Sequence, residues 1–134
     1  MKMKEMCIEE RSDSKIVCSE NNRKIIFNNP SRNTVKKIKV DGCQITTGIR
    51  CDFLVIETNK NEHFIELKGQ NIKHAFEQLK RSIQLLSESD KKTCYVICSK
   101  SPLTSAQIQN EMLNFRKLHN SKLVVRSGSF EVDI

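Results

Sequence analysis

The stretch CDFLVIETNKNEHFIELKG, residues 51 to 69, decides the fold. Two runs rich in apolar residues flank a polar segment, which is the pattern of two strands joined by a hairpin. We expect strands over 50–57 and 63–68, with the turn inside 58–62. Side chains alternate along a strand, and here both alternating sets are largely apolar. The pair is therefore expected to be covered on both faces.

Three charged residues interrupt these apolar runs. Alternation predicts that Asp52 shares a face with Leu54, while Cys51 points to the other face. Glu66 and Lys68 are two residues apart and share one face. A turn with an odd number of residues would place Asp52 opposite Glu66 or Lys68, where Cβ atoms are about 5 Å apart. Two carboxylates and one ammonium group are thus expected to converge.

Such a group needs a counter-charge if it is buried. An unpaired buried carboxylate costs several kcal/mol, and two adjacent carboxylates repel unless one holds a proton or a cation compensates them. Mg²⁺ prefers oxygen ligands, commonly uses one or two carboxylates and keeps positions for water and phosphate oxygens. This chemistry suits phosphodiester hydrolysis. The alternative is that Asp52 lies in water at a strand end, while Glu66 and Lys68 form an ordinary solvated pair.

The remaining elements follow from periodicity. Further strands are expected over 24–27, 35–40, 94–98, 123–125 and 130–132, and a short helix over 3–11. A helix capped by Asn71 follows the hairpin, and the capping-box pattern from Thr104 to Gln107 begins a second helix. The apolar face of that second helix is expected to comprise Ile108, Met112, Phe115 and Leu118. We predict one α/β domain over 1–134, with a single mixed sheet flanked by helices and a parallel connection between 94–98 and 123–125.

The chain is basic, with 23 Lys and Arg against 16 Asp and Glu. No acidic residue occurs from 21 to 40, so nucleic acid or another polyanion is a candidate partner, and a solvated basic face is the alternative. One Tyr, six Phe and no Trp leave few side chains on which single-stranded bases could stack. The residues expected to contact nucleic acid are Arg23, Lys24, Lys36, Lys37, Lys39, Lys73 and Arg81.

The six cysteines form no C-x-x-C pair, so the spacing of common zinc and iron–sulfur ligands is missing. The sequence MKMKEMCIEE lacks the apolar run of a secretory signal, and no run is long enough to span a membrane. We therefore expect a cytoplasmic protein with reduced, mostly buried thiols.

Asp52, followed fourteen residues later by Glu66-Leu67-Lys68 and then a helix, resembles the PD-(D/E)XK superfamily, also called restriction-endonuclease-like. Cys51 occupies the position of the name-giving proline. The resemblance implies that Asp52 and Glu66 hold Mg²⁺ or Mn²⁺. It also implies that Lys68 orients the attacking water or stabilises the developing charge. DNA is expected as the nucleic-acid partner in preference to RNA.

The helix segment HAFEQLKRSIQLL is similar to the glutamine motif of the resolvase-like and RecB-like branches. The resemblance makes Gln78 a candidate site residue, with His74 and Arg81 on the same stripe. Ser82 stands where those branches often have an aromatic residue. Some members use an acid on their first helix, which makes Glu9 or Glu10 a candidate additional ligand.

The expected function is a metal-dependent endodeoxyribonuclease of repair, recombination or phage defence. The resemblance also suggests a homodimer, or a partner protein that supplies specificity. A different class is a non-catalytic module on the same fold that binds nucleic acid or a protein. A third is one member of a toxin and immunity pair, whose basic half faces an acidic partner.

Overall fold

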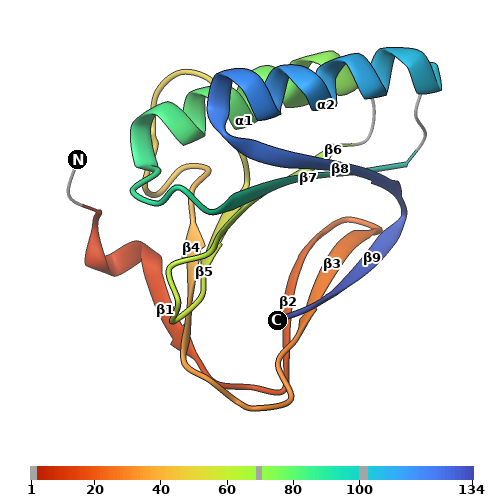
Figure 1. Ribbon diagram of the computed structural model, residues 1–134. Helices are drawn as coiled ribbons and strands as arrows, with labels where there is room; N and C mark the ends of the chain where they lie inside the picture. Colours follow the sequence, from red (N-terminus) through yellow and green to blue (C-terminus); the bar gives the residue numbers. More distant parts are fainter. Residues whose placement is uncertain (1–2, 69–70, 100–102) are drawn as a thin grey trace.

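The computed structural model describes residues 3–68, 71–99 and 103–134 (Figure 1). A short 3₁₀ helix, η1 (Glu5–Cys7), comes first. The strands are β1 (Ile8–Arg11), β2 (Lys15–Glu20), β3 (Arg23–Asn28), β4 (Val35–Lys39), β5 (Phe53–Ile56), β6 (Glu62–Lys68), β7 (Lys92–Cys98), β8 (Ser121–Ser127) and β9 (Ser129–Asp133). The α-helices of this part of the chain are α1 (Ile72–Leu86) and α2 (Ser105–His119).

Six strands form a mixed sheet in the order β1-β4-β5-β6-β7-β8. In this sheet β1, β4, β5 and β6 each run antiparallel to the next, whereas β6, β7 and β8 are parallel to one another. The predicted parallel pairing of the strands before and after α2 is confirmed. Five residues, 57–61, link β5 to β6, so the turn has an odd number of residues.

The prediction of a single sheet flanked by helices is wrong. β2, β3 and β9 form a second, three-stranded sheet, in which β2 and β3 are antiparallel and β3 and β9 parallel. Figure 1 shows both α-helices above the six-stranded sheet and the second sheet below it. β2 was not predicted, because only three of its six residues have apolar side chains. Two of these, Ile16 and Cys18, are buried in the structure.

Two apolar cores result, one on each face of the large sheet. Leu54, Phe64 and Val96 pack with α1 and with Phe115 of α2. Val55, Ile65 and Ile97 pack against the second sheet through side chains such as Ile25 and Phe27. The predicted covering of β5 and β6 on both faces is therefore confirmed.

Both predicted helix caps are confirmed. The Asn71 side chain accepts the His74 N–H, and Thr104 and Gln107 form the reciprocal capping box. The predicted apolar face of α2 is wrong in its extent, because only Phe115 is buried while Met112 and Leu118 are exposed. α2 therefore attaches to the sheet mainly through one aromatic side chain.

The predicted helix over 3–11 is also wrong. Only η1 is helical, and β1 pairs with β4 so that Glu9 lies opposite Lys37 and Glu10 opposite Lys36. Cross-strand pairs of opposite charge favour this strand over the short helix.

Cys7 and Cys43 form a disulfide, which corrects the prediction that all thiols are reduced. Cys18, Cys51 and Cys94 are buried free thiols, as expected, and Cys98 is buried as well. Among the described residues, no helix has the length and apolar character needed to cross a membrane.

Candidate metal centre

Asp52 lies directly before β5, between β4 and β6. Its Oδ2 accepts the Leu67 N–H at 2.8 Å, and its own N–H donates to the Ile65 carbonyl at 3.0 Å. Its carbonyl oxygen accepts the N–H groups of Val40 and Asp41 at 3.0 and 3.3 Å. The backbone and the carboxylate are therefore both held by neighbouring strands.

Glu66 is the third residue from the C-terminal end of β6, and it lies on the face covered by the helices. The β5–β6 register ends with the pair Phe53 and Ile65, so Asp52 and Glu66 directly follow the last paired residues of the two strands. The Asp52 and Glu66 carboxyl groups lie close enough for each to change the pKa of the other. The residue is only 2% exposed, and its Oε1 is buried without a hydrogen-bond partner.

The ladder is interrupted at this point. The Asp52 N–H bonds to Ile65 rather than to Glu66, and the Asp52 carboxylate takes the Leu67 N–H in place of a backbone carbonyl. As a result Cys51 packs with Leu54 on the helix-covered face, so its predicted position on the opposite face is wrong.

The electrostatics show two carboxyl groups that are short of positive charge. Burial raises the pKa of Asp52 to about 6, although the Leu67 N–H acts in the opposite direction. Burial, followed by the negative charge of Asp52, raises the pKa of Glu66 to about 9. At neutral pH the metal-free protein therefore holds a proton on Glu66, shared with Asp52.

Lys68 is the last residue of β6 and shares a face with Glu66. It is half-buried, and its positive charge lowers the pKa of the Glu66 carboxyl without offsetting the effects of burial and of Asp52. The structure thus brings Asp52, Glu66 and Lys68 to one end of β6.

Glu20, at the end of β2, adds a third negative charge that sequence reasoning missed. Its charge raises the pKa of both Asp52 and Glu66. No local pattern could have identified it, because Glu20 reaches this region only through the packing of the second sheet below β6.

Gln78 holds the segment that leads into Asp52. Its Nε2 donates to the Arg50 carbonyl at 2.9 Å, and its Oε1 is buried without a partner. A hollow of about 230 Å³ lies beside it, lined in part by Arg50 and His74.

Arg81 and Ser82 hold the same segment. Arg81 Nη1 donates to the carbonyls of Thr47 and Ile49, and Ser82 Oγ accepts the Cys51 N–H at 2.8 Å. Gly48 makes the Arg81 contact possible, because a Cβ there would lie 2.7 Å from Arg81 Nη1 and its φ is +76°. Three side chains of α1 therefore fix residues 47–51, a role that the sequence did not reveal for Arg81.

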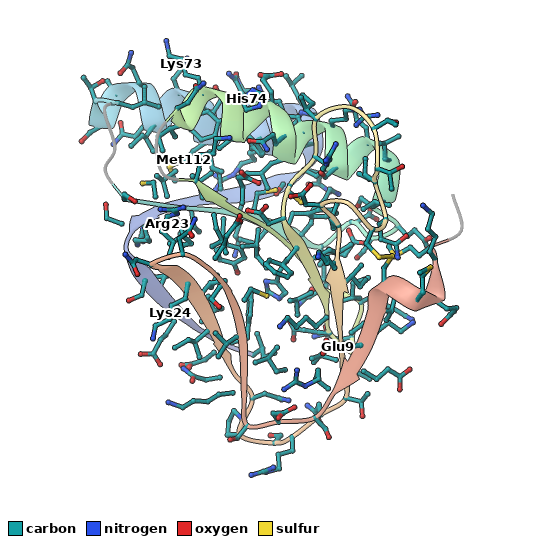
Figure 2. All side chains as sticks on the ribbon, turned by 180° about the vertical axis from the view of Figure 1, so that it is seen from behind. Glu9, Arg23, Lys24, Lys73, His74 and Met112 are labelled. Carbon is teal, nitrogen blue, oxygen red and sulfur yellow. A yellow bond between two sulfur atoms is a disulfide. The ribbon has the colours of Figure 1, made fainter. Side chains whose placement is uncertain are left out.

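Glu9 and Glu10, the candidate additional ligands, lie on β1 rather than on a helix, which corrects that expectation. Glu9 pairs with Arg11 at 3.1 Å. In Figure 2 Glu9 lies far from Arg23, which marks the tip of the β2–β3 hairpin. Neither acid is among the main causes of the shifted pKa values of Asp52 and Glu66.

The predicted nucleic-acid contacts are spread over several surfaces. Alternation along β4 puts Lys36 on the face of Ile38, and Lys37 and Lys39 on the opposite face. Lys37 lies over the Phe53 ring at 5.6 Å. Figure 2 shows Lys73 on the outer surface of α1, pointing away from the sheet.

The donor set suits a hard divalent cation. Asp52 and Glu66 offer carboxylate oxygens, and the buried Oε1 of Glu66 has an unused acceptor site that a cation would satisfy. Within residues 3–68, 71–99 and 103–134, no three His, Cys, Asp or Glu side chains are grouped closely enough to hold an ion. The candidate centre therefore rests on two carboxylates, with the remaining positions left for water and substrate.

Comparison with protein families, with curated proteins and with solved structures gives no match for this chain.

Proposed function

We propose that this protein is a restriction-endonuclease-like, Mg²⁺- or Mn²⁺-dependent nuclease that hydrolyses DNA phosphodiester bonds. The observation that supports the proposal most is the pair Asp52 and Glu66, two neighbouring carboxyl groups, one of which has a buried oxygen without a partner. Lys68 on the same strand face and the +7 net charge agree with an anionic substrate.

Asp52 and Glu66 would hold the metal through their carboxylate oxygens. A bound divalent cation would lower the pKa of a water molecule and neutralise charge on the phosphate. Leu67 holds one Asp52 oxygen by its N–H, which leaves Oδ1 as the Asp52 oxygen without a backbone bond. The Lys68 ammonium would orient the attacking water and stabilise the negative charge that builds up on the phosphate oxygens.

A plasmid-nicking assay with Mg²⁺, Mn²⁺ or EDTA tests the proposal. Wild type should cleave only with metal, and Asp52→Asn, Glu66→Gln and Lys68→Ala should each lower the rate at least about 100-fold. Glu10→Gln, an exposed acid on β1, is the matched control and should retain full activity. Cleavage in EDTA, or full activity in either carboxylate variant, would contradict the proposal.

The same wild-type and variant proteins distinguish a nuclease from the second functional class, a non-catalytic binding module. A non-catalytic module would bind DNA in a salt-sensitive manner without cleaving it in any metal. A protein of a toxin and immunity pair would bind DNA weakly even at low salt. A homodimer, or a partner that directs the enzyme to its DNA, would supply specificity that no visible base-reading element provides.

A further inference from the structure

The tip of the β2–β3 hairpin is fixed beside the carboxyl ends of the parallel strands. Glu20 and Arg23 are the last cross-strand pair before the turn at Asn21 and Asn22. The Lys24 N–H donates to the Gly128 carbonyl at 3.1 Å, and the Gly128 N–H donates to the Cys98 carbonyl at 2.8 Å. Gly128 thus connects the hairpin to the end of β7.

Arg23 extends from this tip toward the strand ends. Its Nη1 donates to Ser99 Oγ at 2.9 Å. Ser99 follows Cys98, whose register partner on β6 is Lys68. Arg23 therefore lies at the same edge of the sheet as Lys68, and Figure 2 shows it where the hairpin tip meets the large sheet.

The Arg23 guanidinium has hydrogen-bonding capacity that the protein leaves unused. Its Nε is buried without a partner, and no ion pair joins Arg23 to a carboxylate in the part of the chain that the structure describes. Its cross-strand neighbour Glu20 instead acts on Asp52 and Glu66. The side chain is half-buried, so part of it remains open to solvent.

An uncompensated and partly desolvated guanidinium is unfavourable, and a phosphate group is the ligand that best matches its planar set of donors. Lys24, the next residue, is exposed and presents an ordinary solvated ammonium. The two adjacent cations therefore differ in kind: one is anchored by Ser99 at the sheet edge, and the other is free to move.

We propose that Arg23, anchored by Ser99, forms a phosphate-binding subsite for the nucleic-acid backbone beside the candidate metal centre. This inference rests on the proposed function for its substrate, DNA. It assigns to the second sheet a direct part in substrate binding. A general basic field would instead make Arg23 and Lys15 equivalent, because each contributes one positive charge to the same hairpin.

Fluorescence anisotropy with a labelled 20-base-pair DNA duplex in EDTA tests the subsite without requiring cleavage. Arg23→Ala should weaken binding about 10-fold or more, whereas Lys15→Ala, the charge-matched control at an exposed position of the same hairpin, should weaken it less than about 2-fold. Arg23→Lys should recover only part of the affinity, because it keeps the charge and loses the planar donors. Ser99→Ala should weaken binding about 3-fold while leaving every charge in place.

Equal losses for Arg23→Ala and Lys15→Ala, full affinity in Arg23→Lys, or no duplex binding by wild type would each overturn the subsite. Thermal unfolding shows whether each variant is folded, and Ser99→Ala carries the test if Arg23→Ala is not. Mn²⁺ titration separates the two proposals. Failure of wild type to bind Mn²⁺ would count against the metal centre alone, whereas the subsite predicts unchanged Mn²⁺ affinity in Arg23→Ala.

Discussion

Glu66 shows what a single buried acid contributes at the residue scale. Its neighbours on β6, Ile65 and Leu67, are buried apolar residues, and its own carboxyl has one oxygen without a partner. Such a group lowers stability in the absence of a ligand, and it persists in proteins where function requires it. We therefore expect the Asp52 and Glu66 carboxyl groups to favour metal binding and to lower the stability of the metal-free protein.

The first prediction concerns Glu66→Gln in the metal-free protein. The folded-state pKa of Glu66 is raised to about 9, so the unfolded chain loses this proton at lower pH than the folded protein. The wild type is thus progressively destabilised as pH rises from about 4.5 to about 9. The neutral amide removes this effect and can still donate to Asp52, so Glu66→Gln should be more stable at pH 8 by about 2 kcal/mol.

Urea unfolding at pH 4.5 and pH 8 in EDTA measures this difference. The stability gain of the variant should be present at pH 8 and close to zero at pH 4.5. Saturating Mn²⁺ should stabilise the wild type and have no effect on Glu66→Gln. A variant that is less stable than wild type at both pH values would show that the carboxyl is paired and solvated after all.

The sequence indicated Asp52, Glu66 and Lys68, because these charged residues interrupt strands whose other side chains are largely apolar. It did not find Glu20, which is an ordinary exposed acid at a hairpin. The predicted face for Cys51 was wrong, because the pattern of side chains does not show where the backbone hydrogen bonds between two strands are interrupted.

At the element scale, α1 acts on the site through residues 47–51. The Arg81 guanidinium binds two carbonyls of this segment and packs against Gly48, and Gln78 and Ser82 hold its last two residues. Since Cys51 precedes Asp52 directly, the conformation of this segment sets where the Asp52 carboxylate lies. The motif resemblance drew attention to Gln78, but the sequence alone could not show that its contact is with the backbone.

The second prediction is that Arg81→Ala lowers Mn²⁺ affinity about 10-fold while the protein remains folded. The variant loses two hydrogen bonds, each worth about 1 kcal/mol, and frees the segment before Asp52. Arg81→Lys should restore part of the affinity, and Lys73→Ala, an exposed cation on the same helix, is the charge-matched control. Calorimetry gives both affinities, and an unchanged value in Arg81→Ala would contradict this positioning role.

The third prediction concerns the disulfide, which ties η1 to the segment after β4. Cys7 and Cys43 are 36 residues apart, and a cross-link of this length stabilises by about 2 to 4 kcal/mol. Reductant should therefore lower the urea midpoint of wild type and have no effect on Cys7→Ser. Cys18→Ala, which removes a buried free thiol, should keep the response to reductant. A wild type insensitive to reductant would show that the bond does not form in solution.

At the scale of the whole molecule, the order of strands and helices from β3 onward could be predicted, because each element has its own periodicity or cap. The division into two sheets could not. It depends on β9 pairing with β3, more than a hundred residues earlier in the chain, and no local pattern reports such a contact. The N-terminal strand β1 was missed for a related reason, since its charges favour a strand only once Lys36 and Lys37 lie beside it.

The two-sheet arrangement brings the β2–β3 hairpin under the strand that carries Glu66 and Lys68. It also separates the basic residues of the first forty positions. Lys36 lies on one face of the large sheet, Lys37 and Lys39 on the other, and Arg23 at the strand ends. We therefore expect substrate contacts to concentrate near the hairpin tip, rather than along the whole acid-free stretch.

Anomalous diffraction from a crystal soaked in Mn²⁺ tests the central claim most directly. A single strong peak should lie within about 2.5 Å of carboxylate oxygens of both Asp52 and Glu66, and it should vanish in crystals of Glu66→Gln. A soaked wild-type crystal with no peak at these two carboxylates, or with the same peak in the variant, would contradict the metal centre.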